Sequence, residues 1–263
     1  QDGIEWTPPL PIARIHEGHY QVSNCQGQRL GTAFNYHPRG LGLNHRTNLY
    51  YMQSSDGGDT WTNAQGETLA LPLTEPHNPA LIRDYEADGL KVYMKDLNFD
   101  AAGNPIILHL VSGGWEPGPE NGPRTWMVAH WTGVEWAFHS ITGSGNNYDT
   151  GSIHVEADGT WRVIGPTDLG PQPYNPGGEV AMWVSRDEGE TWRRVRRLTR
   201  DSEYNHTYVR RPVDAHPGFY GFWADGHARE RSPSRLYFCD RLGAVWRLPE
   251  SMPGAVGRPE RVH

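Results

Sequence analysis

Two copies of one eight-residue pattern set the strongest limit on how this chain can fold. Residues 54–61 read SSDGGDTW and residues 185–192 read SRDEGETW, so both fit Ser-x-Asp-x-Gly-x-Thr-Trp. The Ser and Asp side chains can hydrogen-bond the backbone of a tight turn, and the glycine can take the positive φ angle that the turn needs. The Thr and Trp suit the start of a strand, with the indole packed beneath the turn. A repeated turn of this kind predicts a repeated β-unit.

Tryptophans close similar turns along the whole chain. They lie 55, 75, 56 and 54 residues apart and are Trp6, Trp61, Trp136, Trp192 and Trp246. Spacings of this size are typical of β-propeller blades, each a four-stranded antiparallel sheet. The longer second unit contains residues 113–122 (GGWEPGPENG), which we expect to form an extended loop. No segment has a sustained 3.6-residue period, so the predicted fold class is all-β with almost no helix.

The repeats divide the chain into four predicted blades and a tail. The blades span approximately residues 7–61, 62–136, 137–192 and 193–246, and the tail is 247–263. The first few residues resemble the second half of a Ser-Asp turn, which indicates that the chain begins inside a blade. Two architectures fit four countable units: a compact four-bladed ring, or the C-terminal part of a longer propeller. We favour the longer propeller.

The composition agrees with short strands and frequent turns, and it disfavours several classes of protein. Glycine occurs 31 times and proline 21 times in 263 residues. A net charge of −7 argues against a general nucleic-acid binder. Mean hydropathy is −0.70, and no apolar run is long enough to cross a bilayer, so no membrane partner is expected. Cys25 and Cys239 fall in different repeats, which argues against a disulfide framework, and no Cys/His zinc spacing occurs.

The predicted inner hairpins bring chemically active side chains to one end of the blades. In the first unit, a hairpin that turns at residues 26–27 places residues 19–20 opposite 35–37. In the fourth unit, residues 205–208 come to lie beside 223–227. These strand ends lie opposite the Ser-Asp turns, and in a radial fold they converge on a common mouth. The side chains expected there include His19, Tyr20, Tyr36, His37, Arg39, Lys95, Asp96, Tyr148, Asp149, His206, Tyr208, Arg210, Asp225 and His227.

Imidazoles, phenols and cations together suit proton abstraction from a carbon beside a carboxylate. One group removes the proton, another protonates the leaving oxygen, and a cation stabilises the enediolate-like state. Aromatic faces can also stack on sugar rings. The catalytic candidates are His19, His37, Tyr36, Tyr20 and Arg39. The substrate-binding candidates are Lys95, Tyr148, His206, Tyr208, Arg210, Trp223 and His227.

These histidines also have plainer interpretations. Any one of them can be a hydrogen-bonded residue at a blade end, and only their clustering favours catalysis. His206, Asp225 and His227 could coordinate a metal, but spacing at strand ends is weak evidence for it. We therefore predict no catalytic metal and no cofactor, while a structural cation such as calcium remains compatible with the sequence.

Several of these segments resemble a known family. The two Ser-Asp turns resemble the Asp-boxes of the bacterial-neuraminidase-repeat (BNR) proteins, which are sialidase-like β-propellers. Residues 45–51 (HRTNLYY), 204–208 (YNHTY), 222–226 (FWADG) and 236–238 (LYF) are similar to the branch that includes ulvan lyases, rhamnosyl-glucuronate lyases and a propeller rhamnosidase. The resemblance implies a seven-bladed propeller, of which about four blades are present here. It also implies an extracellular or periplasmic protein that acts on an acidic polysaccharide or oligosaccharide.

The resemblance also suggests roles for individual residues. In those lyases, two histidines at the ends of an inner hairpin, with a tyrosine and an arginine nearby, carry the elimination. His19 and His37 occupy such positions here, beside Tyr20, Tyr36 and Arg39. Because the pair lies in an early blade of the lyases, His19 and His37 are either that pair or subsite residues.

Three functions remain open from the sequence. The first is a polysaccharide lyase that cleaves a uronate-containing polysaccharide by β-elimination. In this hypothesis His19 or His37 is the base, Tyr36 or Tyr20 the acid, and Arg39 or Lys95 the carboxylate clamp. The second is a glycoside hydrolase, rhamnosidase-like or sialidase-like, acting at the same face. The third is a glycan-binding propeller without catalysis.

Overall fold

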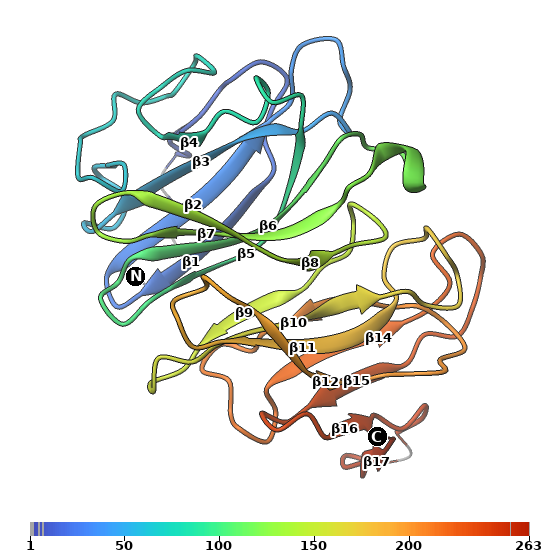
Figure 1. Cartoon of the computed structure of the whole chain (residues 1–263). Coiled ribbons are helices and arrows are strands. Elements are labelled where there is room, and N and C mark those ends of the chain that lie inside the picture. Colours follow the sequence, from blue (N-terminus) through green and yellow to red (C-terminus); the bar gives the residue numbers. More distant parts are fainter. Residues whose placement is uncertain (1–2, 5, 7, 253, 263) are drawn as a thin grey trace.

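The computed structural model describes residues 3–4, 6, 8–252 and 254–262, and these form four antiparallel sheets in chain order. Figure 1 shows the sheets following one another from the blue N-terminal blade to the red C-terminal blade. Blade 1 contains β1 (Gln21–Gln26), β2 (Arg29–Tyr36), β3 (Thr47–Ser54) and β4 (Leu81–Arg83). Blade 2 contains β5 (Lys91–Phe99), β6 (Pro105–Ser112), β7 (Thr125–Trp131) and β8 (Trp136–Gly143).

The second half of the chain repeats this arrangement. Blade 3 contains β9 (Ser152–Val155), β10 (Trp161–Asp168), β11 (Glu179–Ser185) and β12 (Arg193–Arg197). Blade 4 contains β13 (His206–Arg210), β14 (Gly221–Asp225), β15 (Leu236–Cys239), β16 (Val245–Arg247) and β17 (Glu260–Arg261). Within the described ranges, the helical structure is limited to one 3-10 turn, η1 (Pro119–Asn121). The prediction of an all-β fold with four propeller blades is confirmed.

The sheets do not end where the tryptophan spacing divides the chain. They span residues 21–83, 91–143, 152–197 and 206–261. The predicted divisions at 61, 136 and 192 therefore separate the outermost strand of each of the first three sheets, in whole or in large part, from its own blade. The reason is that the tryptophan closes the turn after the third strand, and the fourth strand follows it. The predicted tail, 247–263, contributes a fifth strand, β17, which pairs with β16.

The repeated turns adopt the hydrogen bonding that their sequence predicts. In the first copy, the Ser54 hydroxyl accepts the Gly58 amide at 2.9 Å, and the Asp56 carboxylate accepts the Thr60 amide at 3.0 Å. The Trp61 indole donates to the Gly58 carbonyl at 3.0 Å. The second copy makes the same three contacts, at 2.9, 3.0 and 2.9 Å. We call these turns the Asp-box turns, and the blade ends that carry them the Asp-box end.

Neighbouring blades pack face to face through apolar side chains. Trp126 and Trp161 lie in the core between blades 2 and 3, and Ile164 and Trp223 lie in the core between blades 3 and 4. Burying a side chain of this size contributes roughly 1.5–3 kcal/mol. The far face of blade 1 is covered by residues 61–80, whereas blade 4 leaves several apolar side chains on its far face half-exposed.

Side-chain hydrogen bonds also join the innermost strands, β1, β5, β9 and β13. Asn24 on β1 donates to the Leu97 carbonyl on β5 at 2.9 Å, and Asn98 on β5 donates to the Ile153 carbonyl on β9 at 3.0 Å. Ser152 on β9 completes the series by donating to the Val209 carbonyl on β13 at 2.9 Å. The ends of these strands opposite the Asp-box turns therefore share one surface, which we call the mouth. Within the described ranges there is no helix of the length and apolarity needed to span a bilayer.

Candidate functional site

A cleft of about 390 Å³ opens at the mouth, and all four blades or their linkers contribute to it. Its lining combines three cations with four phenols. The lining residues are Tyr20, Gln21, Val22, Arg46, Tyr93, Met94, Lys95, Tyr148, Thr150, Tyr208 and Arg210. Among the described residues, none of its three cations forms an ion pair with a carboxylate. The cleft is therefore suited to an anionic ligand.

Arg46 lies at the centre of the phenols. Its guanidinium carbon is 3.8 Å from the ring centroid of Tyr20, 4.7 Å from that of Tyr93 and 5.2 Å from that of Tyr148. It also donates to the Tyr148 hydroxyl at 3.4 Å. Rings that face a guanidinium hold it in place and leave its charge available to a ligand.

Asn44 fixes two of these phenols. Its carbonyl accepts the Tyr93 hydroxyl at 2.6 Å, and its side-chain oxygen accepts the Tyr148 hydroxyl. Burial, together with the neighbouring Tyr148, raises the pKa of Tyr93 to about 12, so it stays a neutral phenol. The loop between β2 and β3 is thus tied to the linker between blades 2 and 3.

Lys95 reaches the cleft because β5 is irregular at this residue. The pairing with β6 passes from Met94 to Asp96, so Lys95 is the extra residue of a β-bulge, a feature that re-aims a side chain. Its ammonium donates to the Asn147 carbonyl at 2.6 Å. Burial lowers the pKa of Lys95 to about 7, with Asp149 opposing the shift.

Asp149 is buried beside the cleft and held by three donors. The Ser144 hydroxyl donates at 2.5 Å, the Gly177 amide at 2.7 Å and the Asn146 amide at 3.1 Å. Burial nevertheless raises the pKa of Asp149 to about 6, because desolvation outweighs these hydrogen bonds. Its charge and that of Lys95 therefore depend on each other.

Blade 4 contributes through a second irregular strand. The pairing of β13 with β14 shifts between Thr207 and Arg210, and Tyr208 has a φ angle of 62°. A bulky residue in this left-handed region is strained, and such strain often marks functional sites. The Arg210 guanidinium lies 4.1 Å from the Tyr208 ring centroid and donates to the Lys95 carbonyl at 3.4 Å.

The two histidines singled out in the sequence lie in different environments. The Ile15 amide donates to Nε2 of His19 at 3.1 Å, so Nδ1 carries the proton and donates to the Asn35 carbonyl at 3.0 Å. His37 is 1% exposed, its Nδ1 has no hydrogen-bond partner, and its ring contacts Tyr20 edge-on at 5.2 Å. Burial and the nearby Arg46 lower the pKa of His37, which favours the neutral imidazole.

Of the other three catalytic candidates, Tyr36 and Arg39 lie outside the cleft lining. The Tyr36 hydroxyl donates to the Glu86 carboxylate, and its pKa is raised by burial and by that carboxylate. Arg39 is exposed in the loop after β2. Tyr20, in contrast, borders the cleft and is 43% exposed.

Three substrate-binding candidates in blade 4 form contacts within the blade. Nδ1 of His206 accepts the Trp223 indole at 3.0 Å, and its Nε2 lies 2.9 Å from the Ser202 hydroxyl. Trp223 is 1% exposed. His227 caps its own loop by accepting the Glu230 amide at 3.0 Å. The remaining four candidates, Lys95, Tyr148, Tyr208 and Arg210, all line the cleft.

Sequence reasoning missed Arg46 and Tyr93 as site residues. Arg46 lies in the run 45–51, which the sequence marks only as similar to the ulvan lyase branch. A signal was available, because residues just before the third strand lie at the same blade end as those just after the second. Tyr93 gave no such signal, since it lies inside a strand and not at a strand end.

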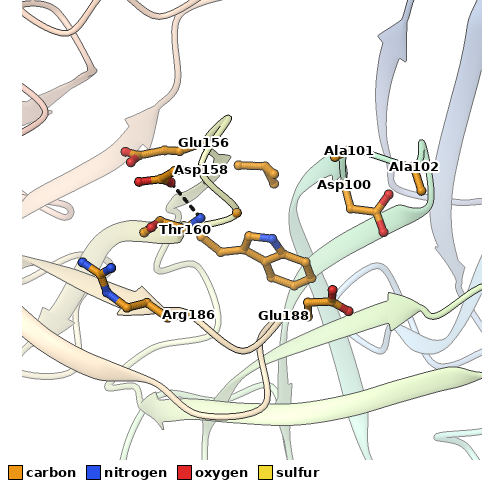
Figure 2. A pocket seen from close by; sticks show the side chains of 11 residues that line it. Asp100, Ala101, Ala102, Glu156, Asp158, Thr160, Arg186 and Glu188 are labelled. Atoms are coloured by element: carbon orange, nitrogen blue, oxygen red, sulfur yellow. Dashed lines mark hydrogen bonds between the residues drawn. The ribbon is translucent and has the colours of Figure 1, made fainter.

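A second hollow, of about 450 Å³, lies at the Asp-box end between blades 2 and 3 (Figure 2). Three of the four carboxylates that line it have partners: Asp158 accepts the Thr160 amide at 3.0 Å, drawn as a dashed line, and Glu156 accepts Arg162 at 2.6 Å. Asp100 lies 3.0 Å from His130. In the part of the chain that the structure describes, no cluster of metal-ligating side chains is present. Most of the carboxylates of this hollow are therefore engaged within the fold.

A β-propeller with Asp-box turns at one end and a cleft of phenols and cations at the other defines the class of this protein. A sequence model of the BNR repeat-containing family matches residues 19–161. Because this match covers more than half of the chain, the chain belongs to the BNR repeat-containing family.

Relatives in that branch are ulvan lyases. The chain is 24% identical over 219 residues to an ulvan lyase of Alteromonas sp. (strain LOR), covering 78% of this chain and 43% of that protein. It is 24% identical over 178 residues to an ulvan lyase of Pseudoalteromonas sp. (strain PLSV), covering 63% and 35% of the two chains. The chain thus spans less than half the length of these relatives.

Solved structures agree on the fold. An ulvan lyase of polysaccharide lyase family PL25, bound to a glucuronate-containing saccharide, superposes with a TM-score of 0.64 at 20% identity, covering 84% of this chain and 51% of the other. The polysaccharide lyase Uly1 superposes with a TM-score of 0.55 at 13% identity, covering 85% and 46%.

Proposed function

We propose that the mouth cleft binds a uronate-containing polysaccharide and cleaves it by β-elimination. The observation that carries this proposal is the convergence of Arg46, Lys95 and Arg210, none of them ion-paired, with four phenols on one cleft. The relatives named above, which are ulvan lyases, support the same substrate class. An extracellular or periplasmic location is part of the proposal, since a polymeric substrate would meet the protein there.

In this reaction the cations bind the uronate carboxylate and stabilise the charge that develops when the neighbouring C–H bond breaks. The carbon–oxygen bond to the leaving sugar then breaks, a carbon–carbon double bond forms, and the leaving oxygen takes a proton. We assign proton transfer to Tyr20 and His37, a phenol at the cleft and a neutral imidazole in ring contact with it. His19 positions the chain instead, because both of its ring nitrogens are engaged.

The test is the ultraviolet absorbance of the unsaturated uronate formed from ulvan and other acidic polysaccharides. The expected result is product formation that falls about 100-fold in Arg46→Ala and is reduced in both Tyr20→Phe and His37→Ala. No unsaturated product from any uronate-containing polysaccharide contradicts the proposal. Release of reducing sugar without unsaturation indicates hydrolysis.

One set of observations favours a second candidate, a glycan-binding propeller without catalysis. Of the five predicted catalytic residues, His19 is held by the backbone, Tyr36 binds Glu86 and Arg39 lies outside the cleft lining. This alternative predicts saturable binding of acidic oligosaccharides whose length does not change during the measurement. Calorimetric titration followed by chromatography of the recovered saccharide separates the two candidates.

A further inference from the structure

Two loops at the mouth expose aromatic rings that the cleft does not use. Residues 113–122 connect β6 to β7 and carry Trp115, which is 42% exposed. Residues 169–178 connect β10 to β11 and carry Tyr174, which is 45% exposed. Aromatic side chains are enriched at binding surfaces relative to the rest of a protein's surface.

A short linker that helps build the cleft also anchors the first loop. Asn147, in the linker between blades 2 and 3, donates to the Gly114 carbonyl at 2.8 Å, directly beside Trp115. The Asn147 backbone carbonyl is the one that accepts Lys95. Trp115 is therefore attached through one residue to the ammonium group at the cleft.

A buried guanidinium makes this loop rigid. Arg124 is 6% exposed and donates to the Glu116 carbonyl, to the Gly118 carbonyl at 2.5 Å and to the Asn147 side chain at 3.1 Å. A buried charge is costly unless it is well hydrogen-bonded, so these contacts hold the loop backbone in one conformation. The backbone on both sides of Trp115 is thus fixed before any ligand arrives.

The same linker anchors the second loop from its other side. Asn146 donates to the Tyr174 carbonyl at 2.7 Å, and the Gly177 amide donates to Asp149 at 2.7 Å. Tyr174 has a φ angle of 62°, a strained conformation for a bulky residue that the surrounding contacts must maintain. Tyr148, between these anchors, lines the cleft.

We propose that Trp115 and Tyr174 are sugar-stacking platforms that flank the cleft, so that the mouth binds an extended run of a polysaccharide. Aromatic faces pack against the apolar faces of sugar rings, and a rigid loop lowers the entropy cost of binding. The inference rests on the proposed function only in taking the ligand to be a glycan. The mouth then recognises internal stretches of a polymer more tightly than its short ends.

The experiment measures affinity against chain length. Ulvan oligosaccharides from disaccharide to decasaccharide are titrated by calorimetry into the full chain carrying Tyr20→Phe, which slows cleavage during the measurement. In that background, Trp115→Ala and Tyr174→Ala are each expected to weaken decasaccharide binding about 2- to 10-fold and to leave disaccharide binding unchanged. Trp115→Tyr, which keeps a ring, should retain most of the affinity. Leu169→Ala removes an exposed non-aromatic side chain from the second loop and should change nothing.

Two outcomes overturn the inference. Either both alanine variants bind the decasaccharide like the parent protein, or they weaken disaccharide and decasaccharide binding by the same factor. The proposed function fails separately, when the unmodified protein gives no unsaturated product. Length-dependent binding that depends on the two rings would then still stand.

Discussion

The two ends of the blades carry similar polar side chains and use them differently. At the Asp-box end, Asp56 accepts hydrogen bonds from Thr60 and Ser54, and three of the four carboxylates of the hollow between blades 2 and 3 are engaged within the fold. At the mouth, Arg46, Lys95 and Arg210 face a cleft and form no ion pair among the described residues. Polar groups with partners inside the fold stabilise it, whereas cations that form no direct ion pair keep charge available to a ligand. Changes at the first end should therefore alter stability, and changes at the second should alter activity.

The largest effect is expected for Trp61→Ala at the Asp-box end. The indole is 7% exposed and packs in the core of blade 1, so its removal should lower the free energy of unfolding by about 3–5 kcal/mol. Chemical denaturation measures this loss. Trp6→Ala is the matched control. Trp6 is 86% exposed, so this substitution should lower the free energy of unfolding by less than about 0.5 kcal/mol. If folded Trp61→Ala protein also lost its cleavage activity, the two ends would not be separable.

At the mouth, Arg46→Ala should lower kcat/KM on acidic polysaccharide by about 100-fold, or about 2.7 kcal/mol, while stability changes little. The reason is that the three phenols hold this guanidinium where the carboxylate would bind. Initial rates of product absorbance provide the measurement. Arg186→Ala removes an exposed guanidinium beside the hollow at the Asp-box end and should leave kcat/KM unchanged. Equal losses in both variants would refute the contrast between the two ends.

Gly189→Ala tests the backbone of the second Asp-box turn. Gly189 has a φ angle of 89°, and an added Cβ would lie 2.8 Å from the Trp161 ring, which is buried. Strain and overpacking together should cost about 1–3 kcal/mol of unfolding free energy. Thermal unfolding measures the change. Gly159→Ala is the comparison variant. The φ angle of Gly159 is also positive, at 82°, but a Cβ added there would have no neighbouring atom within 4 Å, so the loss of unfolding free energy should be smaller.

Lys95→Arg should change the pH dependence of activity. Burial lowers the pKa of Lys95 to about 7, so the ammonium loses its charge as the pH rises through neutrality. A guanidinium keeps its proton, and the alkaline fall in kcat/KM should therefore move to higher pH. Lys95→Met should remove that limb and lower kcat/KM below about pH 7, where the unmodified lysine carries its charge. An alkaline limb identical in all three proteins would exclude Lys95 as the carboxylate-binding cation.

The smallest effect is expected in the first Asp-box turn. Hydrogen bonds from Thr60 and Ser54 hold the pKa of Asp56 well below its usual range. Its stabilising contribution is therefore present above the unfolded-state pKa and is lost as the pH falls through the lower folded-state pKa. The stability deficit of Asp56→Asn should shrink on acidification. Chemical denaturation of both proteins across a series of acidic pH values measures this deficit, and a deficit that does not change with pH would contradict the prediction.

Much of the mouth could be predicted from the sequence, because hairpin geometry decides which strand ends meet. Tyr20, Lys95, Tyr148, Tyr208 and Arg210 were all expected at this end and all line the cleft. Hairpin geometry does not decide which way a side chain at a strand end points. For that reason it could not distinguish Tyr20, at the cleft, from Tyr36, whose hydroxyl binds Glu86.

The histidines show the same limit. His206 and Trp223 were expected to bind substrate, yet they hydrogen-bond each other inside blade 4. His19 donates to the strand opposite it, so the pairing that was read as catalytic also satisfies the backbone. Contacts of this kind depend on the packing of several strands, which no local pattern reports.

The repeating unit can be read from local sequence alone. Each Asp-box turn forms from hydrogen bonds and an indole contact within eight residues. The spacing of the turns therefore predicts the blades without any knowledge of how they pack. Which groups face the cleft depends instead on how the strands and blades pack. Two irregular inner strands turn Lys95 and Tyr208 toward it, and a linker between blades sets Tyr148 against Arg46. The physical reason is that a shift of one residue in strand pairing reverses the direction of a side chain.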